Sequence, residues 1–367
     1  MVTAGAPWDE QDVAALDTPV VVVNHARLVA NIAATADAVR AHGVSLRPHV
    51  KTHKSLDVAR LQIEHGAQGL TVATVGEAEL FAAGGFDDLF IAFPVRATGP
   101  KATRLRALAG ACRLRVGVES VSSAKLLGEA LRGTDASVVV EIDSGGSRTG
   151  TPTADGALLV ADAARAAGLQ VDGVFTHGGH SYAARGISQE VAEEEVRGLL
   201  GAAEALRSTG HEVTVISAGS TPTAVLAAHL PVTEVRPGTY VFQDRLQVEL
   251  GSCRPDEVSL AVATTVVARH ADRVVVDAGA KTLSKDVPGV LHGHGSILGR
   301  PHLTIERVYD HHGVVTGPAD EMPRIGEVVW VVPNHVCPVV DLSPDVLVDL
   351  GGGRLESWPV HARGLSR

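Results

Sequence analysis

Short runs of β-branched residues alternate with stretches of helical period from about residue 19 to residue 240. The runs predict nine strands, near 20–23, 44–50, 69–73, 88–92, 113–117, 137–142, 170–175, 213–217 and 232–236. Between them, segments rich in Ala and Leu predict helices at 26–42, 76–84, 99–110, 121–132, 154–167 and 188–209. Strands that alternate with helices in this way form parallel sheets. The pattern therefore predicts an α/β fold.

Nine predicted strands are one more than a closed (β/α)8 barrel contains. We interpret the first, at 20–23, as a strand that belongs to a second domain. A doubly wound sheet is the main alternative. The chain lacks its dinucleotide fingerprint G-x-G-x-x-G after the first strand, and it has no G-x-x-x-x-G-K-[ST] phosphate loop. We therefore expect a TIM-type (β/α)8 barrel.

The pattern changes after about residue 245. Consecutive β-rich runs follow at 257–268, 273–277, 304–309, 327–332, 345–349 and 356–361, with no convincing amphipathic helix between them. This predicts a C-terminal all-β domain. The expected organisation is an N-terminal segment at 1–24 that joins the β domain, a barrel at 25–244 and the β domain at 245–367.

Composition narrows the function. The 367 residues carry a net charge of −10 and only 3% aromatic residues, whereas a nucleic-acid binder needs a basic face and aromatic rings that stack on bases. No apolar run approaches the roughly 20 residues that span a bilayer, and the N-terminus lacks the features of a secretory signal. We expect a cytoplasmic protein with neither nucleic acid nor membrane as a partner. The scattered Cys112, Cys253 and Cys337 include no C-x-x-C, which argues against a disulfide framework or a structural zinc knuckle.

The densest group of reactive side chains is the segment LRPHVKTHK at 46–54. On a strand, side chains alternate between faces, so Arg47, His49 and Lys51 share one face. Barrel enzymes keep their active sites at the carboxyl ends of strands, and a lysine there can form an imine. An edge strand with a solvated basic face is equally compatible with this spacing.

Three glycine-rich loops follow later predicted strands: DSGGSRTG at 143–150, SAGSTPT at 217–223 and RPGTY at 236–240. Exposed backbone N–H groups, hydroxyls and a following helix N-terminus bind anions, and barrels often bind phosphate on their last two loops. The segment HGGHSY at 177–182 has two histidines three residues apart. They could bind a metal, line a substrate pocket or cap a turn.

The segment PNHVCP at 333–338 places His335 two residues before Cys337. On an extended segment, both side chains point to one face and can share a zinc ion. A buried cysteine beside a hydrogen-bonded histidine is the alternative.

Together, these motifs resemble the fold-type III pyridoxal-phosphate (PLP) enzymes, which join an alanine-racemase-like barrel to a C-terminal β domain. Within that group the chain is most similar to the D-serine dehydratase and D-threo-3-hydroxyaspartate dehydratase family, with D-threonine aldolases next. The resemblance runs along nearly the whole chain, through DTP, RPHVKTHK, GEAELFAAGGFDDLFIAFPV, HGGHSY, GSTPT, PGTYVF, LGSC, VVDAG and PNHVC. It implies a homodimer that uses PLP and a divalent metal, with zinc expected first and manganese or cobalt as alternatives.

The resemblance also implies roles for single residues. The Schiff-base lysine falls on Lys51, which leaves Lys54 in a supporting or exposed position. The metal pair falls on His335 and Cys337. The phosphate contacts fall on Ser217, Gly219, Ser220, Thr221, Gly238 and Thr239. Further cofactor contacts are expected from Arg148, His177, Tyr182 and Tyr240, and further catalytic groups from Tyr182 and His180.

The implied activity is a lyase that converts a D-3-hydroxy amino acid into a 2-oxo acid and ammonia, with D-serine expected first and D-threonine or 3-hydroxyaspartate as alternatives. A D-threonine aldolase is the second hypothesis. The dehydratases resemble K-T-H-K and H-x-C as they stand here, whereas the aldolases carry aspartate in place of Cys337 and histidine in place of Tyr182. The ending ARGLSR is closer to the aldolases, and Lys281 replaces an aromatic residue of several dehydratases.

Two further alternatives carry less weight. An amino-acid racemase has no evident use for a metal pair. A non-catalytic PLP carrier, similar to the PLP-homeostasis proteins, would lack both the H-x-C pair and the domain at 245–367.

Overall fold

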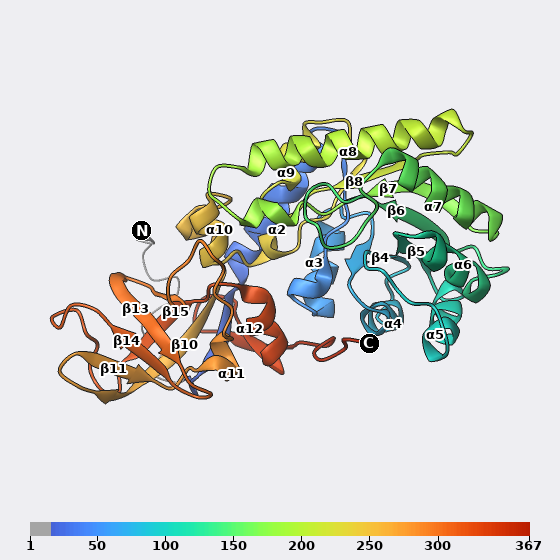
Figure 1. Ribbon diagram of the computed structural model, residues 1–367. Helices are drawn as coiled ribbons and strands as arrows, with labels where there is room; N and C mark the ends of the chain where they lie inside the picture. Colours follow the sequence, from blue (N-terminus) through green and yellow to red (C-terminus); the bar gives the residue numbers. More distant parts are fainter. Residues whose placement is uncertain (1–15) are drawn as a thin grey trace.

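The computed structural model describes residues 16–367, so most of the expected N-terminal segment lies outside the described residues (Figure 1). Its larger sheet has eight parallel strands in the order β2-β9-β8-β7-β6-β5-β4-β3. The two edge strands meet, because His49 and Thr71 form a parallel bridge and the Thr71 N–H donates to the Pro48 oxygen at 2.9 Å. The predicted parallel α/β arrangement is confirmed, and the sheet closes on itself as a barrel.

The barrel strands lie close to their predicted positions. They are β2 (Ser45–Leu46), β3 (Leu70–Val72), β4 (Asp88–Ile91), β5 (Arg113–Val118), β6 (Ser137–Glu141), β7 (Gln170–Phe175), β8 (Val215–Ala218) and β9 (Glu234–Val235). The helices are α2 (His25–Arg40), α3 (Leu56–Glu64), α4 (Val75–Ala83), α5 (Pro100–Ala109), α6 (Val121–Ala130), α7 (Ala154–Ala166), α8 (Ser188–Ser208) and α9 (Ala224–Ala228). Two helices were not predicted: α9, which has only five residues, and α3, which has nine. Among residues 16–367, no helix is long and apolar enough to cross a membrane.

The second sheet is mainly antiparallel. Its strands are β1 (Val20–Asn24), β10 (Leu260–Arg269), β11 (Arg273–Val276), β12 (Ser296–Ile297), β13 (Arg300–Val308), β14 (Gly313–Thr316), β15 (Val328–Val332), β16 (Asp345–Asp349) and β17 (Leu355–Pro359). Strand β1 lies between β10, to which it is antiparallel, and β16, to which it is parallel. The first strand of the chain thus joins the second sheet, and Figure 1 shows these strands beside the barrel.

Short helices interrupt the β-rich part, which the sequence pattern did not predict. They are α10 (Arg245–Leu250), α11 (Ala280–Leu283) and α12 (Val336–Leu342). Helix α12 packs against the 3-10 turn η1 (Val50–Thr52) of the barrel, so the second part of the chain reaches the barrel beside Lys51.

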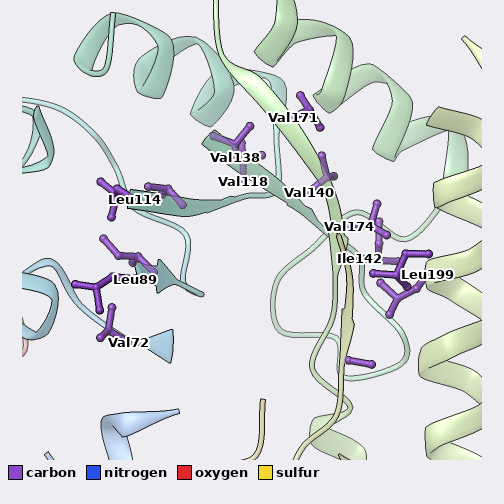
Figure 2. Packing of buried hydrophobic residues seen from close by; sticks show 14 of the residues in the cluster. Val72, Leu89, Leu114, Val118, Val138, Val140, Ile142, Val171, Val174 and Leu199 are labelled. Atoms are coloured by element: carbon purple, nitrogen blue, oxygen red, sulfur yellow. The ribbon is translucent and has the colours of Figure 1, made fainter. Parts of the chain in front are cut away.

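Strand residues of the barrel alternate between two environments. On β6, Val138 and Val140 belong to the apolar cluster between strands and helices, whereas Val139 faces the interior with Phe90 and Phe175. Figure 2 shows the outward-facing cluster, which runs across successive strands to helix α8. This alternation buries the outer face of each strand and leaves the inner face to position polar groups.

The amino-terminal half of the barrel interior is charged. The Arg47 side chain is 2% exposed, and its guanidinium contacts Glu234 at 2.6 Å and Asp88 at 2.7 Å. Arg115 contacts Asp172 at 3.0 Å. The alternative of an edge strand with a solvated basic face is therefore wrong, because Arg47 is paired inside the barrel.

We expect Asp88→Asn to lower the free energy of unfolding by about 3–5 kcal/mol, because it removes one of the two carboxylates that pair with the buried Arg47. Burial opposes ionisation of Asp88, but hydrogen bonds and charges from Arg47 outweigh burial, so its pKa lies below the ordinary 3.8. A lowered pKa stabilises the fold above pH 3.8, and this contribution disappears as the pH falls through the folded-state value. The loss should therefore shrink in acid.

Urea unfolding at neutral and acidic pH measures this effect. Asp37→Asn is the control, because the Asp37–Arg40 pair is exposed and is expected to contribute less than about 1 kcal/mol. Equal losses in the two variants at neutral pH would contradict the prediction.

Candidate active site

A pocket opens at the carboxyl ends of the barrel strands, where barrel enzymes place their active sites. It contains most of the predicted cofactor contacts. Its lining is formed by His49, Lys51, Ala73, Ala92, Phe93, Glu141, Arg148, Phe175, His177, Tyr182, Ser220, Thr221, Arg236, Gly238 and Thr239.

Lys51 lies in this pocket, in η1 rather than at the end of a long strand. Strand β2 ends at Leu46, four residues before the predicted end, and the chain then turns through η1. Burial lowers the pKa of Lys51; the charge of Cys337 opposes this shift and that of Arg148 adds to it. A lowered pKa favours the neutral amine, which is the nucleophilic form. Lys54 does not line the pocket and instead forms an ion pair with Asp341, whose carboxylate lies 2.6 Å from its Nζ.

Two histidines line the pocket beside Lys51. Burial lowers the pKa of His49 and of His177 well below the usual value, and the charge of Lys51 lowers both further. Both rings are therefore neutral at physiological pH. The ring of His177 lies 6.5 Å from that of Tyr182.

The pair His335 and Cys337 lies next to the pocket. His335 is the N-cap of α12 and Cys337 lies in its first turn, so the expected extended segment is wrong. Pro338 occupies the same first turn, where a helix needs no N–H donor. The Cys337 Sγ lies 3.2 Å from the Thr52 hydroxyl, and Nδ1 of His335 lies 2.6 Å from a carboxylate oxygen of Asp286.

The two side chains affect each other's ionisation. Burial opposes charge on both, yet the mutual attraction lowers the pKa of Cys337 and raises that of His335 to about 10. No group of three or more His, Cys, Asp or Glu side chains suited to a metal occurs within residues 16–367. A thiolate and an imidazole fit a zinc-type site whose other positions are open, and Asp286 is placed to orient the ring of His335.

Two known family models match this chain. The family model for the alanine racemase N-terminal domain matches residues 23–245. The chain belongs to this family. A second model, for a serine dehydratase domain, matches residues 259–348. Relatives over nearly the whole chain are named D-threo-3-hydroxyaspartate dehydratase, D-threonine aldolase and D-serine dehydratase, which supports a PLP lyase that acts on D-hydroxy amino acids.

Individual relatives of the family span nearly the whole chain. A D-threo-3-hydroxyaspartate dehydratase from Delftia sp. (strain HT23) is 36% identical over 94% of this chain and 97% of that protein. A D-threonine aldolase from Arthrobacter sp is 34% identical over 96% of this chain and 94% of that protein. A solved structure of a D-threo-3-hydroxyaspartate dehydratase, a cysteine-to-alanine mutant in the metal-free form, has a TM-score of 0.88 and 34% identity, and covers 95% of this chain and 98% of that one.

The pocket fits the PLP of this family. Two buried polar atoms in its lining, the Thr221 hydroxyl and Oε2 of Glu141, have no hydrogen-bond partner within the described residues. At Gly238 a Cβ would lie 2.9 Å from the Thr52 hydroxyl and 3.1 Å from the His49 carbonyl oxygen. Only glycine therefore fits at Gly238 without displacing the backbone near Lys51. The Thr221 hydroxyl, which lacks a hydrogen-bond partner, and the pocket wall at Gly238, which has no side chain, suit a phosphate group.

Two residues assigned to the phosphate lie outside this lining. The Ser217 hydroxyl donates to Oε1 of Glu234 at 2.7 Å, inside the barrel. The Gly219 N–H donates to Oε1 of Glu195 at 3.3 Å. Gly219 has a φ of +85°, which favours glycine and lets the chain turn there.

Two further assigned residues point away from the pocket. Tyr240 lies in the apolar cluster of the second sheet, and its hydroxyl accepts a hydrogen bond from Gln62 at 3.0 Å. Nε2 of His180 lies 3.0 Å from Glu194, and its ring packs over Gly145. Neither side chain belongs to the pocket lining.

Sequence reasoning missed several lining residues. Glu141 stands just before the loop DSGGSRTG and Arg236 begins the loop RPGTY, so their position at the carboxyl ends of predicted strands was the available signal. Phe175 lies in no motif, and the segment GEAELFAAGGFDDLFIAFPV at 76–95 contains Phe93 but gave no role for it. Phe93 is 54% exposed and Phe175 is buried against Phe90, so the pocket has an open apolar side.

Proposed function

We propose that this protein is a PLP- and divalent-metal-dependent dehydratase of D-3-hydroxy amino acids, with D-serine as the expected substrate, and that it acts as a homodimer. The observation that carries the proposal is a buried lysine next to a thiol–imidazole pair at one pocket. Lys51 lines the pocket, and among charged groups Cys337 has the largest effect on the pKa of Lys51, which it raises. A lysine for the α-proton and a metal for the β-hydroxyl are the two groups that dehydration needs.

The pocket residues have separate roles in this reaction. Lys51 holds the cofactor and, once the substrate has displaced it, its Nζ accepts the proton from Cα. Arg148 at the pocket wall pairs with the substrate carboxylate. Bound PLP supplies an electron sink for the negative charge that develops at Cα.

His335 and Cys337 would hold the divalent metal, and its other positions would stay open to the substrate. A metal held there supplies Lewis-acid chemistry to the β-hydroxyl as a leaving group. Solved structures of the dehydratase relative include a histidine-to-alanine mutant and, two positions further along, a cysteine-to-alanine mutant in the metal-free form. Their spacing matches that of His335 and Cys337.

Retro-aldol cleavage would need a base for the β-hydroxyl proton. Tyr182 is a poor base, because burial raises its pKa above the ordinary value and the charge of Cys337 raises it further. The phenol therefore stays protonated at neutral pH. His180 points to Glu194 instead of into the pocket. Both observations support dehydration over cleavage.

Ammonia and pyruvate release from D-serine tests the proposal. The purified, PLP-loaded protein with zinc should release the two products in equal amounts, because loss of water from the substrate and hydrolysis of the C–N bond yield one of each. L-serine is the control for stereochemistry. Release from neither enantiomer, or from L-serine alone, would reject the assignment.

Alanine variants of the two loop histidines should separate their roles. His177→Ala is expected to lower kcat/KM for D-serine by about 100-fold, because His177 lines the pocket and its loss lets neighbouring groups shift. His180→Ala should change kcat/KM by less than about threefold, since His180 pairs with Glu194 and does not line the pocket. Steady-state kinetics measure both, and the reverse order would make His180 the pocket residue.

A further inference from the structure

The barrel interior beneath the pocket holds a continuous chain of buried polar side chains. It begins at Arg236, which lines the pocket floor and is 6% exposed. The Arg236 guanidinium donates to the Ser217 hydroxyl and to the Thr176 carbonyl oxygen. The Ser217 hydroxyl donates in turn to Oε1 of Glu234 at 2.7 Å. Ser217 therefore links a buried cation to a buried carboxylate.

Arg236 has no direct ionic partner. Within residues 16–367 no carboxylate oxygen lies within ion-pair distance of its guanidinium, which lies 5.7 and 5.2 Å from the ring centroids of Phe90 and Phe175. A buried charge without a partner is costly unless hydrogen bonds connect it to an opposite charge. The Ser217 hydroxyl provides this connection, and Glu234 supplies the opposite charge.

Glu234 is fixed from its other side. Its Oε2 lies 2.6 Å from Nε of Arg47 and 3.5 Å from the guanidinium of Arg115. Arg47, the closer of the two arginines, is held in turn by Asp88 at 2.7 Å. The carboxylate cannot turn away from Ser217 without breaking contacts with Arg47 and Arg115.

We propose that Ser217 and Glu234 are positioning residues for Arg236. Glu234, anchored at the far end of the barrel, orients the Ser217 hydroxyl, and that hydroxyl holds the Arg236 guanidinium in the floor of the PLP site. Ser217 thus acts from beneath the site and makes no phosphate contact. This role concerns how PLP binds and does not depend on which substrate bond breaks. PLP binding can therefore be measured separately from the proposed dehydration, and either proposal can fail without the other.

The test measures PLP binding and the visible absorption spectrum of bound PLP. Ser217→Ala removes one hydroxyl and leaves every ion pair in place. It should raise the Kd of the PLP-free protein for added PLP about tenfold, the effect of one hydrogen bond to a charged group, and should shift the spectrum. Glu234→Gln should act in the same direction. Ser217→Thr keeps the hydroxyl and should restore both properties.

Asp172→Asn is the matched control. Asp172 belongs to the same buried network through Arg115 and Ser137, at 3.0 and 2.6 Å. It should lower stability and leave the PLP spectrum and Kd unchanged. An unchanged Kd and spectrum in Ser217→Ala would overturn the proposal, as would equal changes in Asp172→Asn, which would show a merely structural effect. If Glu234→Gln fails to fold, the two Ser217 variants decide the outcome.

Discussion

Replacing Lys51 with alanine is expected to lower ammonia release from D-serine by at least about 1000-fold, because it removes both the covalent attachment of PLP and the base for the α-proton. Lys51 lies in the pocket, and burial lowers its pKa toward the nucleophilic form. The variant should also lose the visible absorbance of lysine-bound PLP. Spectroscopy therefore checks the assignment independently of activity.

Lys54 provides the matched control, three residues along the same segment. Its Nζ is held by Asp341, with Glu77 3.6 Å away, and it is absent from the pocket lining. Lys54→Met should keep the absorbance of lysine-bound PLP. If Lys51→Ala retained this absorbance and Lys54→Met lost it, the lysine assignment would have to move to Lys54.

The second large effect is expected at the metal pair. His335→Ala and Cys337→Ala should each lower kcat for D-serine more than about 100-fold, because Lewis-acid stabilisation of a leaving group contributes several kcal/mol. Both variants should also lose bound zinc, which elemental analysis measures without reference to activity. A stringent chelator should inactivate the wild type to the same extent, and added zinc should restore it.

Cys112→Ala is the control for this prediction. Cys112 is a free cysteine in the loop before β5, and its thiol donates to the Leu108 carbonyl oxygen. Its replacement should change neither zinc content nor kcat. Full activity of the wild type after complete removal of zinc would exclude a catalytic role for the pair.

Hydrophobic patterning predicted the barrel because its strands are buried on both faces. Strands such as β6 and β8 contain only buried residues, and their β-branched runs therefore stand out from the flanking helices. The pattern failed where elements are short. Helix α12 has only seven residues, contains Pro338 and is separated from β15 by three residues, so the pattern did not predict it, although its first turn holds Cys337.

Motifs predicted the segments of the site better than they predicted side-chain directions. Lys51, Arg148 and Tyr182 do line the pocket, because each follows a barrel strand. Ser217 and Tyr240 do not, although they stand in the same segments as the lining residues Thr221 and Thr239. Their directions depend on which buried groups need hydrogen-bond partners, and those partners come from distant strands and helices that no local motif specifies.

The products formed from D-threonine test the central claim most directly, because dehydration and cleavage then start from one substrate in one pocket. PLP- and zinc-loaded protein should convert D-threonine to 2-oxobutanoate and ammonia in equal amounts, with little glycine. Quantification of all four products by chromatography would show this partition. Glycine and acetaldehyde in equal amounts, without 2-oxobutanoate, would contradict the account and identify the protein as an aldolase.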